Sequence, residues 1–157
     1  MSPQSEGPLV LVVDDDPDCC AVAALLLEHQ GYRTMRASSG QECIDLVRSE
    51  PVELVLLDVM MPGMDGFEVC ALLRSEERSR HLPIILLTAR DDMDTRLEGM
   101  YHGVSEFLTK PINKHELFAR VRAQLHIRNL THQLETVERS LETARQSRAA
   151  VRPAGRG

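Results

Sequence analysis

The sequence predicts an α/β protein in which a parallel β-sheet is covered by helices on both faces. Short apolar runs alternate with amphipathic segments over about the first 125 residues. Because parallel strands need crossover connections, this alternation favours a doubly wound sheet. Several of the runs are apolar throughout, which is typical of strands that are buried on both faces.

Five strands and five helices are expected in this part of the chain. The expected strands are 9–13, 32–37, 53–57, 83–88 and 106–109, and the expected helices are 17–30, 39–49, 66–75, 92–101 and a last one from 113 onward. The run 32–37 contains two arginines, so we expect it at an exposed edge of the sheet.

Capping signals support these boundaries. Asp16 precedes Pro17, which predicts an N-cap followed by proline at the first helical position. Gly31 stands where a left-handed C-cap would end the first helix. Asn113, with Glu116 three residues later, is placed to open the last helix.

The composition excludes several classes of protein. The chain has 157 residues, of which 43% are hydrophobic and only 3% aromatic, so its core is aliphatic and stacking on nucleic-acid bases is not expected. No apolar run approaches the roughly 20 residues that span a bilayer, and no signal peptide is evident, so we expect a cytoplasmic protein without membrane contact. The cysteines lack CxxC spacing, so reduced thiols and no cysteine metal site are expected for Cys19, Cys20, Cys43 and Cys70.

The charge is divided unevenly along the chain. Residues 1–111 hold 9 Lys and Arg against 20 Asp and Glu, a net −11, whereas residues 112–157 hold 9 against 4, a net +5. Two parts with different roles are therefore expected. We predict a globular domain over 9–125, a coiled-coil helix over 126–151 and disordered ends at 1–8 and 152–157.

The coiled coil is predicted from a heptad pattern. Apolar side chains recur at alternating spacings of three and four, at Ile127, Leu130, Leu134, Val137, Leu141 and Ala144, and again at Val151 after Arg148 interrupts the pattern. A second copy of the same helix is the natural cover for this stripe, which favours a homodimer over a helix that folds back. The arginines of this segment alternate with glutamates, so a solvated coiled-coil face is favoured over nucleic-acid binding.

Polar residues follow four of the expected strands. Asp14 and Asp15 follow the first strand, Asp58 the third, Thr88 the fourth and Lys110 the fifth. The carboxyl ends of parallel strands meet at one edge, where ligands bind in open α/β sheets. Taken singly, each has a structural explanation, such as an aspartate that starts a turn; together they predict a site.

The residue types at this edge point to phosphate chemistry. Three neighbouring carboxylates repel one another unless a cation binds them, and their hard oxygen ligands suit Mg²⁺. Lys110 supplies a compact positive charge for a phosphate oxygen, and Thr88 supplies a hydroxyl. The set therefore fits a phosphoryl group on or beside Asp58, which a carboxylate nucleophile forms as an aspartyl phosphate.

The blocks LVLVVDDDP, LVLLDVMMPGMDG, IILLTA and FLTKP together resemble the receiver domain of response regulators in two-component signalling. The resemblance covers about residues 9–125 and implies a flavodoxin-like fold with strand order 2-1-3-4-5. It makes Asp58 the phosphoacceptor and Asp14 and Asp15 the acidic metal pair. The other implied roles are a metal-binding backbone carbonyl at Met60, a switch hydroxyl at Thr88, an invariant lysine at Lys110 in a cis peptide with Pro111, and a switch aromatic at Phe107.

The resemblance also implies a mechanism and partners. Asp58 would take a phosphoryl group from a histidine kinase or phosphotransfer protein in a Mg²⁺-dependent reaction. Thr88 would then move toward the phosphoryl group and Phe107 would turn inward. This repacks the face formed by the fourth helix, fifth strand and fifth helix, and acts on the coiled coil and on a downstream effector. Such a domain catalyses only its own phosphorylation and dephosphorylation.

Three alternatives stay open at this point. Aspartate-nucleophile phosphatases use similar residues but need an acid two residues after the nucleophile, where this chain has Met60. A receiver-like scaffold that is never phosphorylated is the second. The third is the amino-terminal receiver of a larger protein with an output domain, such as a diguanylate cyclase or a kinase.

Overall fold

The structure is a computed structural model that describes residues 7–89 and 92–151. The chain divides into two units, Met1–Leu125 and His126–Gly157. Of the ends predicted to be disordered, residues 1–6 and 152–157 lie outside the described residues. Gly7 and Pro8, from the same predicted tail, are held in place, because the Arg33 side chain donates a hydrogen bond to the Gly7 carbonyl and its backbone N–H donates to that of Pro8.

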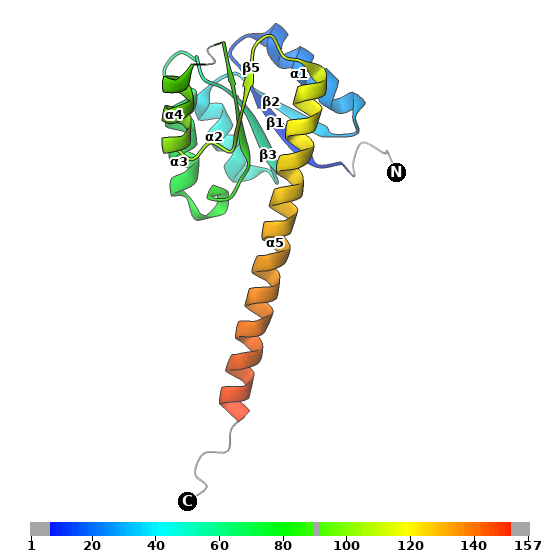
Figure 1. Cartoon of the computed structure of the whole chain (residues 1–157), viewed down its shortest axis with the longest axis vertical. Coiled ribbons are helices and arrows are strands. Elements are labelled where there is room, and N and C mark those ends of the chain that lie inside the picture. Colours follow the sequence, from blue (N-terminus) through cyan, green and yellow to red (C-terminus); the bar gives the residue numbers. More distant parts are fainter. Residues whose placement is uncertain (1–6, 90–91, 152–157) are drawn as a thin grey trace, which may run out of the picture. The chain divides into compact units, whose positions relative to one another are not determined.

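Figure 1 shows the expected parallel sheet of five strands. The strands are β1 (Leu9–Val13), β2 (Arg33–Ala37), β3 (Leu54–Asp58), β4 (Ile84–Thr88) and β5 (Glu106–Thr109). Every neighbouring pair is parallel and the order is β2-β1-β3-β4-β5, which confirms the flavodoxin-like prediction. β2 lies at an edge and is less buried than the central strands, as its arginines predict.

The helices also lie where they are expected. They are α1 (Pro17–His29), α2 (Gly40–Ser49), α3 (Gly66–Ser75), α4 (Met93–Tyr101) and α5 (Lys114–Val151). The short 3₁₀ turn η2 (Glu77–Ser79) between α3 and β4 was not predicted from the sequence.

The predicted caps are formed. Asp16 accepts a hydrogen bond from the backbone N–H of Asp18 with its side chain, and Asn113 caps the start of α5 by accepting from the N–H groups of His115 and Glu116. Gly31 follows α1 with φ 91°, a left-handed conformation that favours glycine.

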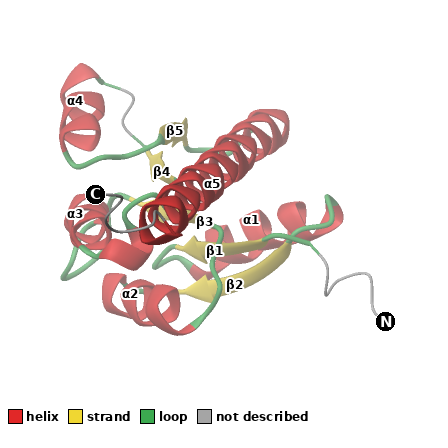
Figure 2. Ribbon diagram, turned by 90° about the horizontal axis from the view of Figure 1, so that it is seen from below, coloured by secondary structure: helices red, strands yellow, loops and turns green. Residues whose placement is uncertain are grey.

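Helices cover both faces of the sheet (Figure 2), and an apolar layer of side chains lies between the helices and the sheet on each face. Successive strand residues point to opposite faces, so the apolar runs supply both layers. α1 and the first part of α5 cover one face, on which Leu27 and Leu117 pack against Val12 and Leu56. α2 and α3 cover the other face together with α4. This packing fixes the strand ends that carry the predicted site.

The cysteines behave as core residues. Cys20, Cys43 and Cys70 are buried, Cys19 is partly buried, and all four are free thiols. Burial raises the pKa of Cys43 to about 12 and that of Cys70 to about 11, so both stay protonated at neutral pH. This agrees with the prediction of reduced thiols.

The second unit carries the predicted apolar stripe. On α5 the side chains at the first five heptad positions are between 52% and 60% exposed, namely Ile127, Leu130, Leu134, Val137 and Leu141.

None of the described helices is both long and apolar enough to cross a membrane.

Candidate functional site

Asp58 is the last residue of β3, and its side chain is buried at the carboxyl edge of the sheet. The chain then turns through Gly63, which has φ 78°, and reaches α3 at Gly66. A Cβ at Gly66 would lie 2.6 Å from the carbonyl oxygen of Asp58, and the Gly66 N–H donates to the Val59 carbonyl at 2.9 Å. Glycine therefore allows α3 to begin against the backbone that carries Asp58.

The acidic pair after β1 joins Asp58. Asp14 is buried and Asp15 is exposed, and carboxylate oxygens of Asp14, Asp15 and Asp58 all lie within 4.8 Å of one another. Asp14 is fixed further because its Oδ1 accepts a hydrogen bond from the backbone N–H of Asp16 at 3.0 Å. An exposed carboxylate beside two buried ones forms an open, oxygen-rich site of the kind that hard cations favour.

Lys110 completes the cluster from the loop after β5. Its Nζ lies 2.8 Å from Oδ2 of Asp14 and 3.4 Å from Oδ2 of Asp58. Its backbone N–H donates to the carbonyl of Thr88 at 2.8 Å, which ties this loop to the end of β4. The peptide bond between Lys110 and Pro111 is cis, as the resemblance implied.

The charges of the cluster act strongly on one another. Burial and then repulsion by Asp14 raise the pKa of Asp58 to about 6, although Lys110 acts in the opposite direction. Burial acts to lower the pKa of Lys110, but the hydrogen bond to Asp14 and the charges of both aspartates outweigh it and raise that pKa. Lys110 is therefore a permanent cation, and its single charge does not neutralise three carboxylates.

Thr88 and Phe107 lie on neighbouring strands beside this cluster. Thr88 is buried at the end of β4, and Asp58 pairs in register with the residue before it, Leu87. Phe107 lies on β5 opposite Leu86, and the residue is 8% exposed. The ring therefore already occupies a buried position in this structure.

Met60 contacts Asp58 through its backbone. Its N–H donates to Oδ1 of Asp58 at 3.3 Å, while its side chain is exposed. The resemblance instead implies that the Met60 carbonyl binds the metal ion, and that role stays a prediction.

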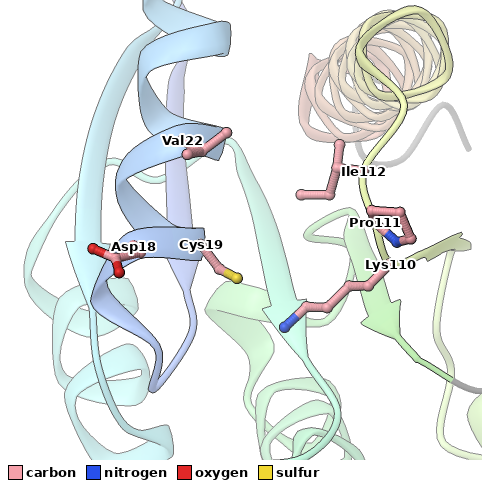
Figure 3. Close-up of a pocket in the computed structure, with 6 residues that line it drawn as sticks. All are labelled: Asp18, Cys19, Val22, Lys110, Pro111 and Ile112. Carbon is pink, nitrogen blue, oxygen red and sulfur yellow. The ribbon is translucent and has the colours of Figure 1, made fainter.

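A pocket beside Lys110 was not predicted from the sequence. A cavity of about 310 Å³ lies between the start of α1 and the loop that leads into α5. Figure 3 shows Cys19 and Lys110 reaching into it from opposite sides. Its lining residues are Asp18, Cys19, Val22, Lys110, Pro111 and Ile112. Exposed Val22 and Leu25 on α1 extend the apolar surface, and two such residues at i and i+3 were the available sequence signal.

A five-stranded sheet of this order, with carboxylates and a lysine at its carboxyl edge, is the architecture of a two-component signalling receiver. The model of the response regulator receiver domain matches residues 10–122, so the chain belongs to this family.

Relatives of known name agree with this assignment. The chain is 38% identical over 131 residues to the response regulator PleD of Caulobacter vibrioides. This aligned region covers 83% of this chain and 29% of PleD. It is 42% identical over 118 residues to the transcriptional regulatory protein AfsQ1 of Streptomyces coelicolor, covering 75% of this chain and 51% of AfsQ1. The chain thus spans about a third to a half of the length of these relatives.

Solved structures share the fold. A response regulator from Chloroflexus aurantiacus matches with a TM-score of 0.75 and 32% identity, covering 77% of this chain and 99% of that one. The receiver domain of the sensor histidine kinase PA1611 from Pseudomonas aeruginosa matches with a TM-score of 0.72 and 27% identity, over 76% of this chain and 98% of that one. That structure holds a magnesium ion coordinated in its active-site cleft.

Proposed function

We propose that Asp58 accepts a phosphoryl group from a histidine kinase or phosphotransfer protein, with Mg²⁺ held by Asp14, Asp15, Asp58 and the carbonyl of Met60. One observation carries this proposal. The Lys110 ammonium lies 3.4 Å from Oδ2 of Asp58, inside a cluster of carboxylates at the carboxyl edge of the sheet. A nucleophile, an anionic cation-binding set and a fixed positive charge thus converge on one point.

The donor set fits a magnesium ion. Its three carboxylates are oxygen ligands, one of which is exposed, so bound waters and a phosphate oxygen would have room to supply the remaining ligands. When bound, Mg²⁺ supplies positive charge that stabilises the phosphoryl oxygens in the transition state. The magnesium-bound receiver from Pseudomonas aeruginosa supports the same assignment here.

The chemistry of the chain itself is a nucleophilic displacement. A carboxylate oxygen of Asp58 forms a bond to phosphorus while the bond from phosphorus to the donor's imidazole nitrogen breaks, and the electron pair stays on that nitrogen. Lys110 offsets the charge that develops on the phosphoryl oxygens. Because burial raises the pKa of Asp58 to about 6, its carboxylate is still mostly ionised at pH 7.5 and is a stronger base than an exposed one.

The pocket beside Lys110 is the proposed docking place of the donor. Its lining includes Val22 and Lys110, so an apolar side chain of a donor helix that enters it brings the donor close to Asp58. Exposed Val22 and Leu25 offer a continuous apolar strip along α1 for such a helix.

After transfer, the new dianion has acceptor oxygens that Asp58 did not have. We propose that the Thr88 hydroxyl donates to one of them and that this movement acts on Phe107, which lies one strand away. The packing of α4, β5 and α5 then shifts between two arrangements, and an effector that prefers one of them reads the signal.

The proposal is tested with acetyl phosphate, a small phosphodonor. Incubation with acetyl phosphate and MgCl₂ is expected to add the mass of one phosphoryl group to the intact protein and to retard it in Phos-tag electrophoresis. Asp58→Asn is expected to abolish both changes. Asp45→Asn, the same chemical change at an exposed position of α2, is the matched control and should be labelled like the natural protein.

The outcomes separate the alternatives. Absence of labelling of the natural protein would support the unphosphorylated scaffold and reject the proposal. Equal labelling of Asp58→Asn would mean that another residue accepts the phosphoryl group, and it would also reject the proposal. Sustained turnover of a phosphomonoester would indicate a phosphatase. No such turnover is expected, because Met60 stands at the position where a phosphatase needs an acid.

We also propose that the chain forms a homodimer through α5. Five apolar side chains at heptad spacing are more than half exposed on the second unit, and a second copy of the helix would bury them. The output is carried either by a separate effector or by a domain on the same natural polypeptide, such as a diguanylate cyclase or a kinase. Immunodetection of the native protein's size distinguishes these two.

A further inference from the structure

Helix α4 contains a glycine that the helix itself does not require. Gly99 lies in the seventh position of this nine-residue helix, where glycine is a much poorer helix former than alanine. Its φ is not in the left-handed region that favours glycine. Within α4, all of whose residues are described, Gly99 alone is buried. The reason for glycine must therefore lie in what it contacts.

That contact is the ring of Phe107. A Cβ at Gly99 would lie 2.5 Å from Cζ and 2.6 Å from Cε1 of the ring, whereas the next nearest atom, on Leu86, would lie at 3.5 Å. Both short distances fall well inside ordinary van der Waals contact. The ring thus fills the space in which any side chain at position 99 would begin.

The same ring is bounded on its other sides. Leu86 of β4 pairs in register with Phe107, and the guanidinium carbon of Arg96 on α4 lies 5.4 Å from the ring centroid, within range of a cation–π interaction. α4 therefore contacts the ring at two positions, three residues apart on the same helix face.

We propose that Gly99 is a positioning residue for the Phe107 switch: its missing side chain keeps the inner site of the ring open beneath α4. A methyl group at position 99 either expels the ring from this site or lifts α4 away from β5. For its consequence in signalling, this inference rests on the proposed function, because phosphorylation is what would act on Phe107.

A double-mutant cycle tests the contact by the sign of an effect. In the natural background, G99A is expected to lower Tm, because the methyl group collides with the ring. In a Phe107→Ala background, where the ring is absent, G99A is expected to raise Tm, because only the helix preference for alanine remains. The cycle with M100A, an exposed neighbour on α4, should show additive effects. If G99A alone does not fold, the F107A variant can still be compared with the G99A/F107A double variant, and the double variant is expected to have the higher Tm.

Fluorine NMR tests the position of the ring directly. The protein has three phenylalanines, Phe67, Phe107 and Phe118, so 4-fluorophenylalanine labelling gives three signals that Phe→Leu variants assign. G99A is expected to move the signal of residue 107 and to increase its shift difference between H₂O and D₂O, which reports exposure to solvent. The signals of residues 67 and 118 should stay in place.

Two results would overturn the inference. One is a G99A effect on Tm of the same sign and size with and without the ring, and the other is an unchanged signal from residue 107. Both measurements use protein without phosphodonor. Failure of acetyl phosphate to label Asp58 would therefore reject the proposed function and leave the Gly99 result standing. If labelling succeeds, beryllofluoride should move the residue 107 signal less in G99A than in the natural protein.

Discussion

The ammonium group of Lys110 lies 2.8 Å from the buried carboxylate of Asp14, although the two residues are 96 positions apart in the sequence. The same ammonium is 3.4 Å from Asp58, so one cation is shared by two buried carboxylates. This arrangement places a positive charge beside Asp58 and leaves net negative charge at the edge of the sheet.

Lys110→Met should separate two roles of this charge. Mg²⁺ is expected to bind several-fold more tightly, because a like charge is removed from its site. Labelling by acetyl phosphate should slow by about a hundredfold, the usual loss when one group that stabilises transition-state charge is removed. Calorimetric titration with MgCl₂ and Phos-tag time courses measure the two effects. Lys114→Met is the exposed control, and weaker Mg²⁺ binding by Lys110→Met would contradict the argument.

The raised pKa of Asp58 predicts how stability depends on pH. The carboxyl titrates near 3.8 when exposed and at about 6 in the folded protein, so the folded state binds the extra proton between these values and stability falls as pH rises through this window. Above pH 6 the ionised carboxylate costs about 2 to 3 kcal/mol. Asp58→Asn should therefore be more stable than the natural protein at pH 7.5, and the difference should vanish near pH 4.

Urea denaturation in EDTA measures this difference. Added MgCl₂ should stabilise the natural protein and narrow the gap to Asp58→Asn, because a cation favours the ionised carboxylate. A stability difference between Asp58→Asn and the natural protein that is constant between pH 4 and 7.5 would contradict the prediction, because it would not follow the titration of Asp58.

Asp15→Asn should affect magnesium binding without affecting the fold. Asp15 is exposed, so its substitution is expected to change the stability of the metal-free protein by less than about 0.5 kcal/mol. The MgCl₂ concentration that gives half of the maximal rise in Tm should increase by at least about tenfold, because one of three carboxylates is lost. Asp18→Asn, an exposed acid outside the cluster, should behave like the natural protein. Equal responses of the two variants would exclude Asp15 from the site.

Arg74→Ala should destabilise the first unit by about 2 to 4 kcal/mol, because partly buried acceptors lose a charged donor. Burial acts to lower the pKa of this guanidinium, which donates to backbone carbonyls and one hydroxyl. Its acceptors are the carbonyls of Ser79, Leu82 and Gly103 and the Oγ of Ser105. Arg78 also donates to carbonyls but is exposed, so Arg78→Ala should cost less than about 1 kcal/mol by urea denaturation. Equal losses of stability in Arg74→Ala and Arg78→Ala would mean that burial does not determine the cost of removing the arginine.

Substitution of Leu134 and Leu141 by Asn should convert a dimer into a monomer. Each leucine occupies a heptad position and is more than half exposed in the single chain, so its burial by a second helix contributes about 2 kcal/mol per side chain. Sedimentation equilibrium measures the change. Arg139→Ala, on the opposite side of the heptad, should leave the dimer intact, and a natural protein that is monomeric at every accessible concentration would reject the coiled coil.

Local patterns were sufficient to predict most of the fold. The apolar runs located all five strands within one residue at each end. The signal is continuous for β1, β3 and β4, because a strand buried on both faces is apolar throughout. The helix ends followed from Asp16, Gly31 and Asn113, whose capping roles depend on neighbours only a few residues away. The turn η2 escaped prediction because its three polar residues carry no periodicity.

The site was predictable in its residues but not in its geometry. The sequence placed Asp14, Asp58 and Lys110 at one edge, since parallel strands share a direction. It did not indicate that one ammonium is shared by two buried carboxylates, because that depends on the depth and direction of each side chain. The pocket beside Lys110 also joins segments far apart in the chain, and the local signal for it was limited to the apolar pair Val22 and Leu25 on α1.

By itself the sequence determined the class of fold, the residues at the carboxyl edge and the heptad stripe, because each depends on residue type and on the spacing between residues close in the chain. The tertiary structure alone decided how the charges are shared at Asp58, why position 99 is a glycine and where the ring of Phe107 lies. These depend on packing between segments that are distant in sequence, where a single Cβ determines which arrangement fits.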